Sequence, residues 1–111
     1  MAYVPDAGDI VWLQFDPQSG HEQAGHRPAL VLSPKSYNGL TNLMICCPMT
    51  TKGKGYRFEV EVSLDDESSF VLSDQVKSVD WVARRAKKKG TAPDEAMRQV
   101  RGRVKALLGL P

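Results

Sequence analysis

Short apolar stretches alternate with polar turns through the first 82 residues of the chain. Each stretch is rich in valine, isoleucine, leucine and aromatic side chains and ends near glycine, proline, asparagine or aspartate. This pattern is typical of β-strands in an antiparallel sheet. The predicted strands are residues 10–15, 28–33, 43–50, 58–62, 70–76 and 79–82, with loops or turns at 34–42, 51–55 and 65–69.

The period of the pattern changes near residue 91. Residues 91–95 have the features of a helix start, because a proline stands at an early position and acidic side chains follow it. Apolar residues then recur at helical spacing until Gly109 and Pro111, namely Ala96, Val100, Val104, Leu107 and Leu108. We expect this stripe to pack on the sheet. The fold class predicted from these elements is a small antiparallel barrel or rolled sheet with one C-terminal α-helix.

The length of 111 residues predicts a single domain spanning residues 1–111. Hydrophobic residues make up 41% of the chain, which is enough for a modest core. A chain of this size buries roughly two-thirds of its unfolded surface. Dimerisation would be a natural way to bury more.

The two cysteines, Cys46 and Cys47, are adjacent in the sequence. Neighbours on a strand point to opposite faces, so this pair makes a poor disulfide and a poor metal site. Residues 1–30 contain no long apolar segment of the signal-peptide kind, and no apolar run approaches the ~20 residues of a membrane helix. We therefore expect a cytoplasmic protein with no disulfide framework, no metal and no membrane partner.

The net charge of +2 hides an uneven distribution. Residues 1–76 carry five Lys/Arg and ten Asp/Glu, whereas residues 77–111 carry ten and three. Five of these cations lie within residues 84–89. A basic patch favours an anionic partner such as a nucleic acid or an acidic peptide. The alternative is a solvated surface loop.

The densest cluster of reactive side chains is Gly20-His21-Glu22-Gln23-Ala24-Gly25-His26-Arg27-Pro28, a polar loop between the first two predicted strands. Two imidazoles, a carboxylate, an amide and a guanidinium lie within seven residues. Pro28 restricts Arg27 to extended geometry, which helps to fix the direction of its guanidinium. A fixed cation and titratable neighbours are the groups needed to bind and cleave a phosphodiester.

With these residues in view, the chain resembles the MazF/PemK toxins of bacterial toxin–antitoxin modules nearly from end to end. Beside the polar loop, the resemblance rests on Gly8-Asp9-Ile10-Val11-Trp12, Phe15-Asp16-Pro17, Leu32-Ser33-Pro34, Pro48-Met49-Thr50-Thr51, Lys54-Gly55-Tyr56 and Leu72-Ser73-Asp74-Gln75-Val76-Lys77. The segment Tyr3-Val4-Pro5-Asp6 points to the MazF branch.

This resemblance implies an SH3-like antiparallel barrel with a C-terminal α-helix, assembled as a homodimer. It implies cleavage of single-stranded RNA at a short sequence, without metal or other cofactor. The 2′-OH of the substrate attacks the phosphate and leaves a 2′,3′-cyclic phosphate and a 5′-OH. Cutting messenger RNA halts translation, and an antitoxin with an acidic, disordered tail neutralises the toxin.

The resemblance also implies roles for individual residues. Arg27 stabilises charge on the phosphate, and Thr50 hydrogen-bonds it. Glu22 is the expected general base, although it could instead form an ion pair with Arg27. The residues expected to contact RNA are His21, Gln23, His26, Lys52, Lys54, Tyr56, Asp74, Gln75 and Lys77.

One departure from the family pattern bears on the mechanism. In another branch, a histidine matching His21 works with an aspartate matching Asp74 and with an arginine two residues before that aspartate. This chain has Leu72 at the arginine position. We therefore expect Arg27 to hold the phosphate.

Two alternative functions keep the same fold. A related branch poisons DNA gyrase by binding and cuts nothing. A plain SH3-like nucleic-acid-binding module would rely on the basic segment alone. Neither alternative would need the polar loop with Arg27 together with Thr50.

Overall fold

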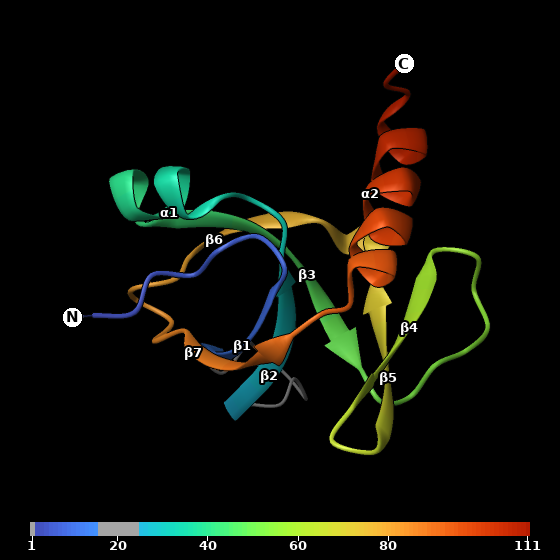
Figure 1. The fold of residues 1–111 in the computed structure, drawn as a ribbon, viewed down its shortest axis with the longest axis horizontal. Coiled ribbons are helices and arrows are strands. Elements are labelled where there is room, and N and C mark those ends of the chain that lie inside the picture. The colour runs from blue at the N-terminus through green and yellow to red at the C-terminus, as the bar shows by residue number, and fades with distance from the viewer. Residues whose placement is uncertain (1, 16–24) are drawn as a thin grey trace, which may run out of the picture.

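The computed structural model describes residues 2–15 and 25–111. Its elements, shown in Figure 1, are β1 (Asp9–Phe15), β2 (Gly25–Val31), α1 (Lys35–Thr41), β3 (Leu43–Thr50), β4 (Glu59–Leu64), β5 (Glu67–Leu72), the 3-10 helix η1 (Ser73–Gln75), β6 (Lys77–Asp80), β7 (Lys87–Thr91) and α2 (Asp94–Leu108). The predicted mainly β fold with a C-terminal helix is confirmed. It takes the form of a curled antiparallel sheet, an open half-barrel with α2 standing against it.

Strand β3 is the central strand of the sheet and pairs with three others. The strand order is β4-β5-β3-β2-β1-β7, and β6 also pairs with β3. Along one edge, β3 pairs with β2. Along its other edge, residues 43–46 pair with β6 and residues 49–50 pair with β5. Because β3 changes partners along its length, the sheet curls around it.

Side chains from the sheet pack into two cores, one on each face. The helix face packs against α2 and includes Ile10, Leu30, Cys47, Met49, Val60, Val71, Met97 and Val100. The opposite face, called here the N-terminal face because Tyr3 covers part of it, includes Val11, Leu13, Ala29, Val31, Met44, Cys46 and Val79. Adjacent residues alternate between the two cores, as the pleat of a strand requires. The prediction that Cys46 and Cys47 point to opposite faces is confirmed, and both are free thiols.

The C-terminal helix also forms as predicted. It begins after Pro93, carries Asp94 and Glu95 in its first turn, and ends at Gly109 in the left-handed conformation with φ 69°. The acidic residues favour the positive end of the helix dipole, and glycine tolerates the positive φ. Ala96, Met97 and Val100 are buried against the sheet, and Val104 is partly buried. The expected packing is wrong for the last two residues of the stripe, because Leu107 and Leu108 are exposed beyond the edge of that core.

The expected loop at 34–42 is wrong, because residues 35–41 form α1. This short helix buries a single side chain, Asn38, and therefore lacks an apolar period. The Asn38 amide donates to the carbonyls of Pro5 (2.8 Å) and Ser33 (3.0 Å), and its side-chain oxygen accepts from Ser33 Oγ at 2.6 Å. The Asn38 carbonyl accepts from Trp81 Nε1 at 2.9 Å. Polar satisfaction rather than apolar burial holds α1 in place.

Other predicted boundaries shift where turn chemistry decides. The predicted strand 70–76 is instead β5, which starts at Glu67 directly after a tight turn whose residues Asp65 and Asp66 have φ of 54° and 61°, and η1 replaces its end. The last predicted strand, 79–82, is observed as β6 at 77–80. The basic segment contributes β7, an edge strand paired with β1. Lysine side chains are common on edge strands because they discourage further pairing.

Candidate functional site

Arg27 lies on strand β2, where it pairs with Leu13 of β1. Its neighbours two positions apart, Ala29 and Val31, are in the core of the N-terminal face. The pleat therefore places Arg27 on that face too, at its exposed margin. The polar loop was predicted to extend through Arg27, but β2 begins at Gly25. The guanidinium thus projects from a strand, which is a firmer support than a loop.

Thr50 ends strand β3 on the same face. Its predecessor Met49 belongs to the helix-face core, so the side chain of Thr50 points the other way. Strands β2 and β3 pair Ala29 with Pro48, and the same register continued by two residues aligns Arg27 with Thr50. The Thr50 Oγ accepts a hydrogen bond from the backbone N–H of Lys52 at 3.1 Å. Its hydroxyl proton can therefore be donated to a ligand.

Besides Arg27, two more basic residues, Lys77 and Arg84, lie close to the N-terminal face. Lys77 pairs with Cys46 across β3 and β6, and its side chain is exposed. Burial raises the pKa of Cys46 to about 11, while the positive charges of Lys77 and Arg84 oppose that rise. Both cations are therefore close enough to act on this thiol through the low-dielectric core.

A cavity of about 440 Å³ adjoins this face, lined by Gln14, Ser78, Val79, Asp80, Ala83, Arg84 and Arg85. Gln14 and Ser78 carried no signal in the sequence, because single polar residues in strands look like ordinary surface positions. The cluster of cations at residues 84–89 was visible, but its fold as a turn leading into β7 was not. Of these cations, Arg84 and Arg85 line the cavity beside Asp80, so its charged lining is positive on balance and suits a phosphate group.

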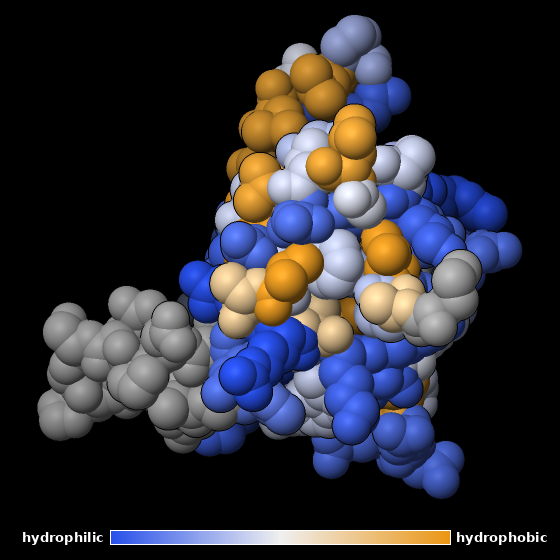
Figure 2. Space-filling view, turned by 90° about the vertical axis from the view of Figure 1, so that its left-hand side faces the viewer, coloured by the Kyte–Doolittle hydropathy of each residue, from blue (hydrophilic) through white to orange (hydrophobic). Residues whose placement is uncertain are grey.

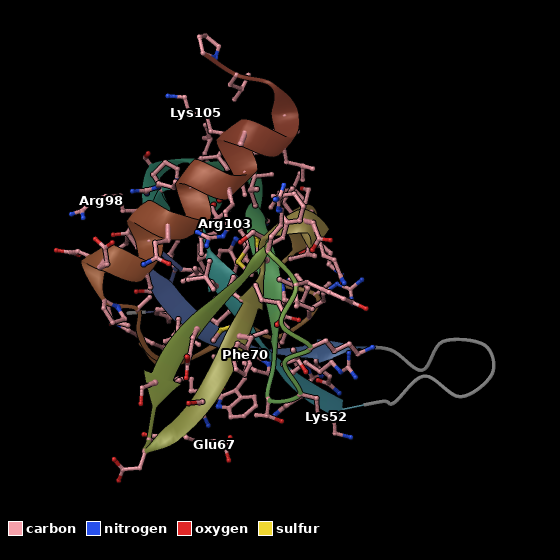
Figure 3. The ribbon with its side chains drawn as sticks, turned by 90° about the vertical axis from the view of Figure 1, so that its right-hand side faces the viewer. Lys52, Glu67, Phe70, Arg98, Arg103 and Lys105 are labelled. Atoms are coloured by element: carbon pink, nitrogen blue, oxygen red, sulfur yellow. The ribbon has the colours of Figure 1, made fainter. Side chains whose placement is uncertain are left out.

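The connection between β3 and β4 carries three of the predicted RNA-contacting residues. Residues 51–57 are all exposed, with Tyr56 at 64% of its surface. Lys52 and Lys54 lie in the same loop directly after Thr50, and Figure 3 shows Lys52 at the end of the sheet remote from α2. The structure therefore joins these three residues to the end of the strand that holds Thr50.

Asp74 and Gln75 are exposed on η1, just before Lys77. The charge of Asp74 contributes to raising the pKa of Cys47, although burial of that thiol is the larger cause. Leu72, the residue at the position of the other branch's arginine, is half-buried at the end of β5. This segment connects β5 to β6 and places the polar side chains of Asp74 and Gln75 directly before Lys77.

The structure separates His26 from Arg27. They are neighbours on β2, so their side chains lie on opposite faces of the sheet. The His26 ring lies near Trp12, with 6.3 Å between ring centroids. Lys89 Nζ lies 4.6 Å from the centroid of the same indole and forms an ion pair with Asp65 at 3.1 Å. His26 thus belongs to an aromatic and cationic cluster apart from Arg27 and Thr50.

Three predicted site residues, His21, Glu22 and Gln23, lie outside the described residues. Within residues 2–15 and 25–111, no group of three or more His, Cys, Asp or Glu side chains is arranged to hold a metal ion. In the same part of the chain, no helix is long and apolar enough to cross a membrane.

Comparison with known proteins places this chain in a family. Residues 6–108 match the family described as PemK-like, MazF-like toxin of type II toxin-antitoxin system. The chain is 50% identical over 107 residues to the endoribonuclease toxin MazF of Escherichia coli K12, covering 96% of each protein, and 38% identical over 109 residues to the endoribonuclease toxin ChpB of the same strain, covering 93% of each. The crystal structure of MazE-MazF from Deinococcus radiodurans superposes with a TM-score of 0.92 at 52% identity, covering 99% of this chain and 100% of that one. The chain therefore belongs to the PemK/MazF family of toxins.

Proposed function

We propose that the protein is an endoribonuclease toxin that cleaves single-stranded messenger RNA and thereby inhibits translation and growth. Two curated relatives, at 50% and 38% identity, are named endoribonucleases. The chain matches each of them over nearly its whole length. Residues 1–111 would act as one toxin domain in the cytoplasm, where messenger RNA is translated.

One observation carries the mechanism. The alternation of side chains along β2 and β3 puts Arg27 and Thr50 on the same face of the sheet, and the β2–β3 register, continued two residues beyond Ala29↔Pro48, would bring them opposite one another. A guanidinium can hold two phosphate oxygens at once, and a threonine hydroxyl can donate to one of them. This pair is a suitable cradle for a single phosphate group.

In the proposed reaction the 2′-OH of the substrate attacks the adjacent phosphorus. Arg27 and Thr50 stabilise the extra negative charge of the phosphorane, and Glu22 takes the proton from the 2′-OH. The bond to the 5′-oxygen breaks and that oxygen takes a proton from solvent water, which leaves a 2′,3′-cyclic phosphate and a 5′-OH. One well-placed donor to a developing negative charge contributes roughly 10²–10³-fold to the rate.

The flanking nucleotides would lie along the cationic surface. Lys77 lies on the same face as Arg27 and would contact the sugar–phosphate backbone of the RNA. Lys52 and Lys54 are exposed and would contact phosphates beyond Thr50. Tyr56 is exposed and can stack on a base. The remaining proposed contacts come from His21, Gln23, His26, Asp74 and Gln75.

An antitoxin partner follows from the family, since Deinococcus radiodurans MazF was crystallised with MazE. We propose that the acidic tail of such an antitoxin binds the same cationic surface as RNA. We also propose a homodimer. Leu107, Leu108 and Leu110 are 44%, 58% and 56% exposed, and Figure 2 shows hydrophobic side chains gathered at the top of the molecule, over the end of α2.

Cleavage of a labelled RNA in EDTA tests this proposal. The parent protein and an Arg27→Ala variant are compared with Arg98→Ala, whose arginine is exposed on α2 and pairs with Glu95. We expect the parent and Arg98→Ala to release fragments with 2′,3′-cyclic phosphate ends, and Arg27→Ala to lose about 10²–10³-fold in rate. Intact RNA with the parent, accompanied by tight binding, would favour a toxin that acts by binding alone.

A further inference from the structure

The loop between β3 and β4 is exposed along residues 51–57, yet its backbone is tied down by a carboxylate. Glu59 Oε1 accepts the N–H groups of Lys54 at 3.0 Å and Gly55 at 3.1 Å, and Oε2 accepts the N–H of Lys54 at 3.1 Å. The Glu59 N–H in turn donates to the Tyr56 carbonyl at 3.0 Å. One residue at the start of β4 therefore closes the loop from both its side chain and its backbone.

Contacts on either side of Glu59 hold the rest of the loop. Arg103 of α2 donates from Nε to the carbonyl of Arg57 at 2.8 Å. Gly53 lies directly on the Phe70 ring, since a Cβ added to this glycine would fall 2.7 Å from two ring carbons. Figure 3 shows Phe70 and Arg103 on the elements that flank the loop. With the hydrogen bond from the Lys52 N–H to Thr50, these contacts fix the ends of the loop and leave its middle to Glu59.

The Glu59 carboxylate binds backbone N–H groups and forms no ion pair with the described lysine side chains of this loop. Among the described residues, no Asp or Glu oxygen lies within ion-pair distance of the ammonium groups of Lys52 and Lys54. Glu59 directs its lone pairs to backbone amides instead. The loop thus combines a fixed backbone with cationic side chains that remain available to an anion.

We propose that Glu59 is a positioning residue for RNA recognition. It does not touch the substrate. It shapes the loop so that Lys52, Lys54 and Tyr56 meet the nucleotides next to the phosphate held at Thr50. This inference rests on the proposed ribonuclease function and deepens it. A loop that already has its binding shape avoids the entropy cost of ordering its backbone when RNA binds.

Charge and positioning predict opposite effects of removing this carboxylate. If Glu59 acted only through its charge, its loss would strengthen binding of polyanionic RNA. If it positions the loop, its loss weakens binding. Glu61 provides a matched control, since it lies two residues further on β4, is exposed and carries the same charge. Among the described residues, its side chain accepts a hydrogen bond only from the Ser68 hydroxyl, at 2.7 Å.

The experiment measures the affinity of a single-stranded, fully 2′-deoxy oligonucleotide, which cannot be cleaved, together with kcat and KM on the matching RNA. Glu59→Ala should weaken binding and raise KM by about tenfold while changing kcat less than about threefold. Glu59→Gln should bind as tightly as the parent, because one side-chain oxygen can still accept both amides. Glu61→Ala should bind at least as tightly as the parent.

Glu59→Asp keeps the charge, and its shorter side chain cannot reach the loop amides, so it should weaken binding as Glu59→Ala does. This variant decides the matter should Glu59→Ala fail to fold. Equal affinities for Glu59→Asp and the parent, or for Glu59→Ala and Glu61→Ala, would overturn the inference. Because affinity for the uncleavable oligonucleotide needs no catalysis, an uncut RNA would count against the proposed function without deciding the role of Glu59.

Discussion

At the scale of single residues, the two thiols show how completely the core of the sheet excludes water. Cys46 and Cys47 are 1% and 0% exposed, and burial raises their pKa values to about 11 and about 12. A thiol reagent should therefore react slowly with the native protein at pH 8 and quickly with the protein in urea.

The same pKa shifts predict a loss of stability in alkali. A thiol whose pKa is higher in the folded than in the unfolded state stabilises the fold fully below about pH 8.5, and that contribution is lost as the pH rises toward 11. The free energy of unfolding should fall by about 2 kcal/mol per thiol between pH 8 and pH 10. Urea titrations with reductant, comparing the parent with Cys47→Ala, measure this difference. An equal alkaline loss in both proteins would contradict it.

The residues of the site illustrate what sequence can and cannot predict. The motif around Arg27 and the hydroxyl of Thr50 could be selected from the order of residues alone. Their common face could not, because it depends on the register Ala29↔Pro48. The position of His26 beside Trp12 could not be predicted either. His26 was expected in a loop, where side chains follow no fixed alternation, but it lies on strand β2, where neighbours point to opposite faces.

At the scale of elements, two glycines should respond in opposite ways to the same substitution. Gly53→Ala forces a methyl group against the Phe70 ring and should destabilise the protein by about 1–3 kcal/mol. Gly102→Ala lies in α2 with nothing within 4 Å of the added carbon, so it should stabilise by about 0.5–1 kcal/mol through helix propensity. Urea unfolding of both variants tests the pair, and changes of the same sign would show that the loop is not packed as described.

Elements with a strong period were predictable and the others were not. Helix α2 followed from its apolar stripe and its glycine end, and the strand pattern of β3 was equally clear. Helix α1 escaped because a buried polar side chain, Asn38, anchors it. Strand β7 escaped because its lysines resemble a solvated run, although its backbone pairs with β1.

At the scale of the whole molecule, the apolar end of α2 calls for a partner surface. Leu110 and Pro111 line a mainly apolar hollow with Leu32 and Val104. We expect the parent to sediment as a dimer and Leu110→Glu to shift it toward the monomer, because a charge on this surface opposes its burial. Leu40→Glu on α1, where the leucine is 86% exposed, serves as the control. A monomeric parent at micromolar concentration would contradict the proposed dimer.

The account as a whole depends on Arg27 and Thr50 acting on one phosphate. If they do, removing one residue should take away much of what the other contributes. Thr51→Ala provides a control for Thr50→Ala, since Thr51 is the exposed next residue of the chain.

The most direct test is a double-mutant cycle on kcat/KM for RNA cleavage, with Arg27→Ala, Thr50→Ala and the two combined. Each single variant should lose about 10²–10³-fold, Thr51→Ala should lose little, and the double variant should fall scarcely below Arg27→Ala alone. Losses that multiply to about 10⁴–10⁶-fold, or an Arg27→Ala variant as active as the parent, would contradict a shared phosphate site.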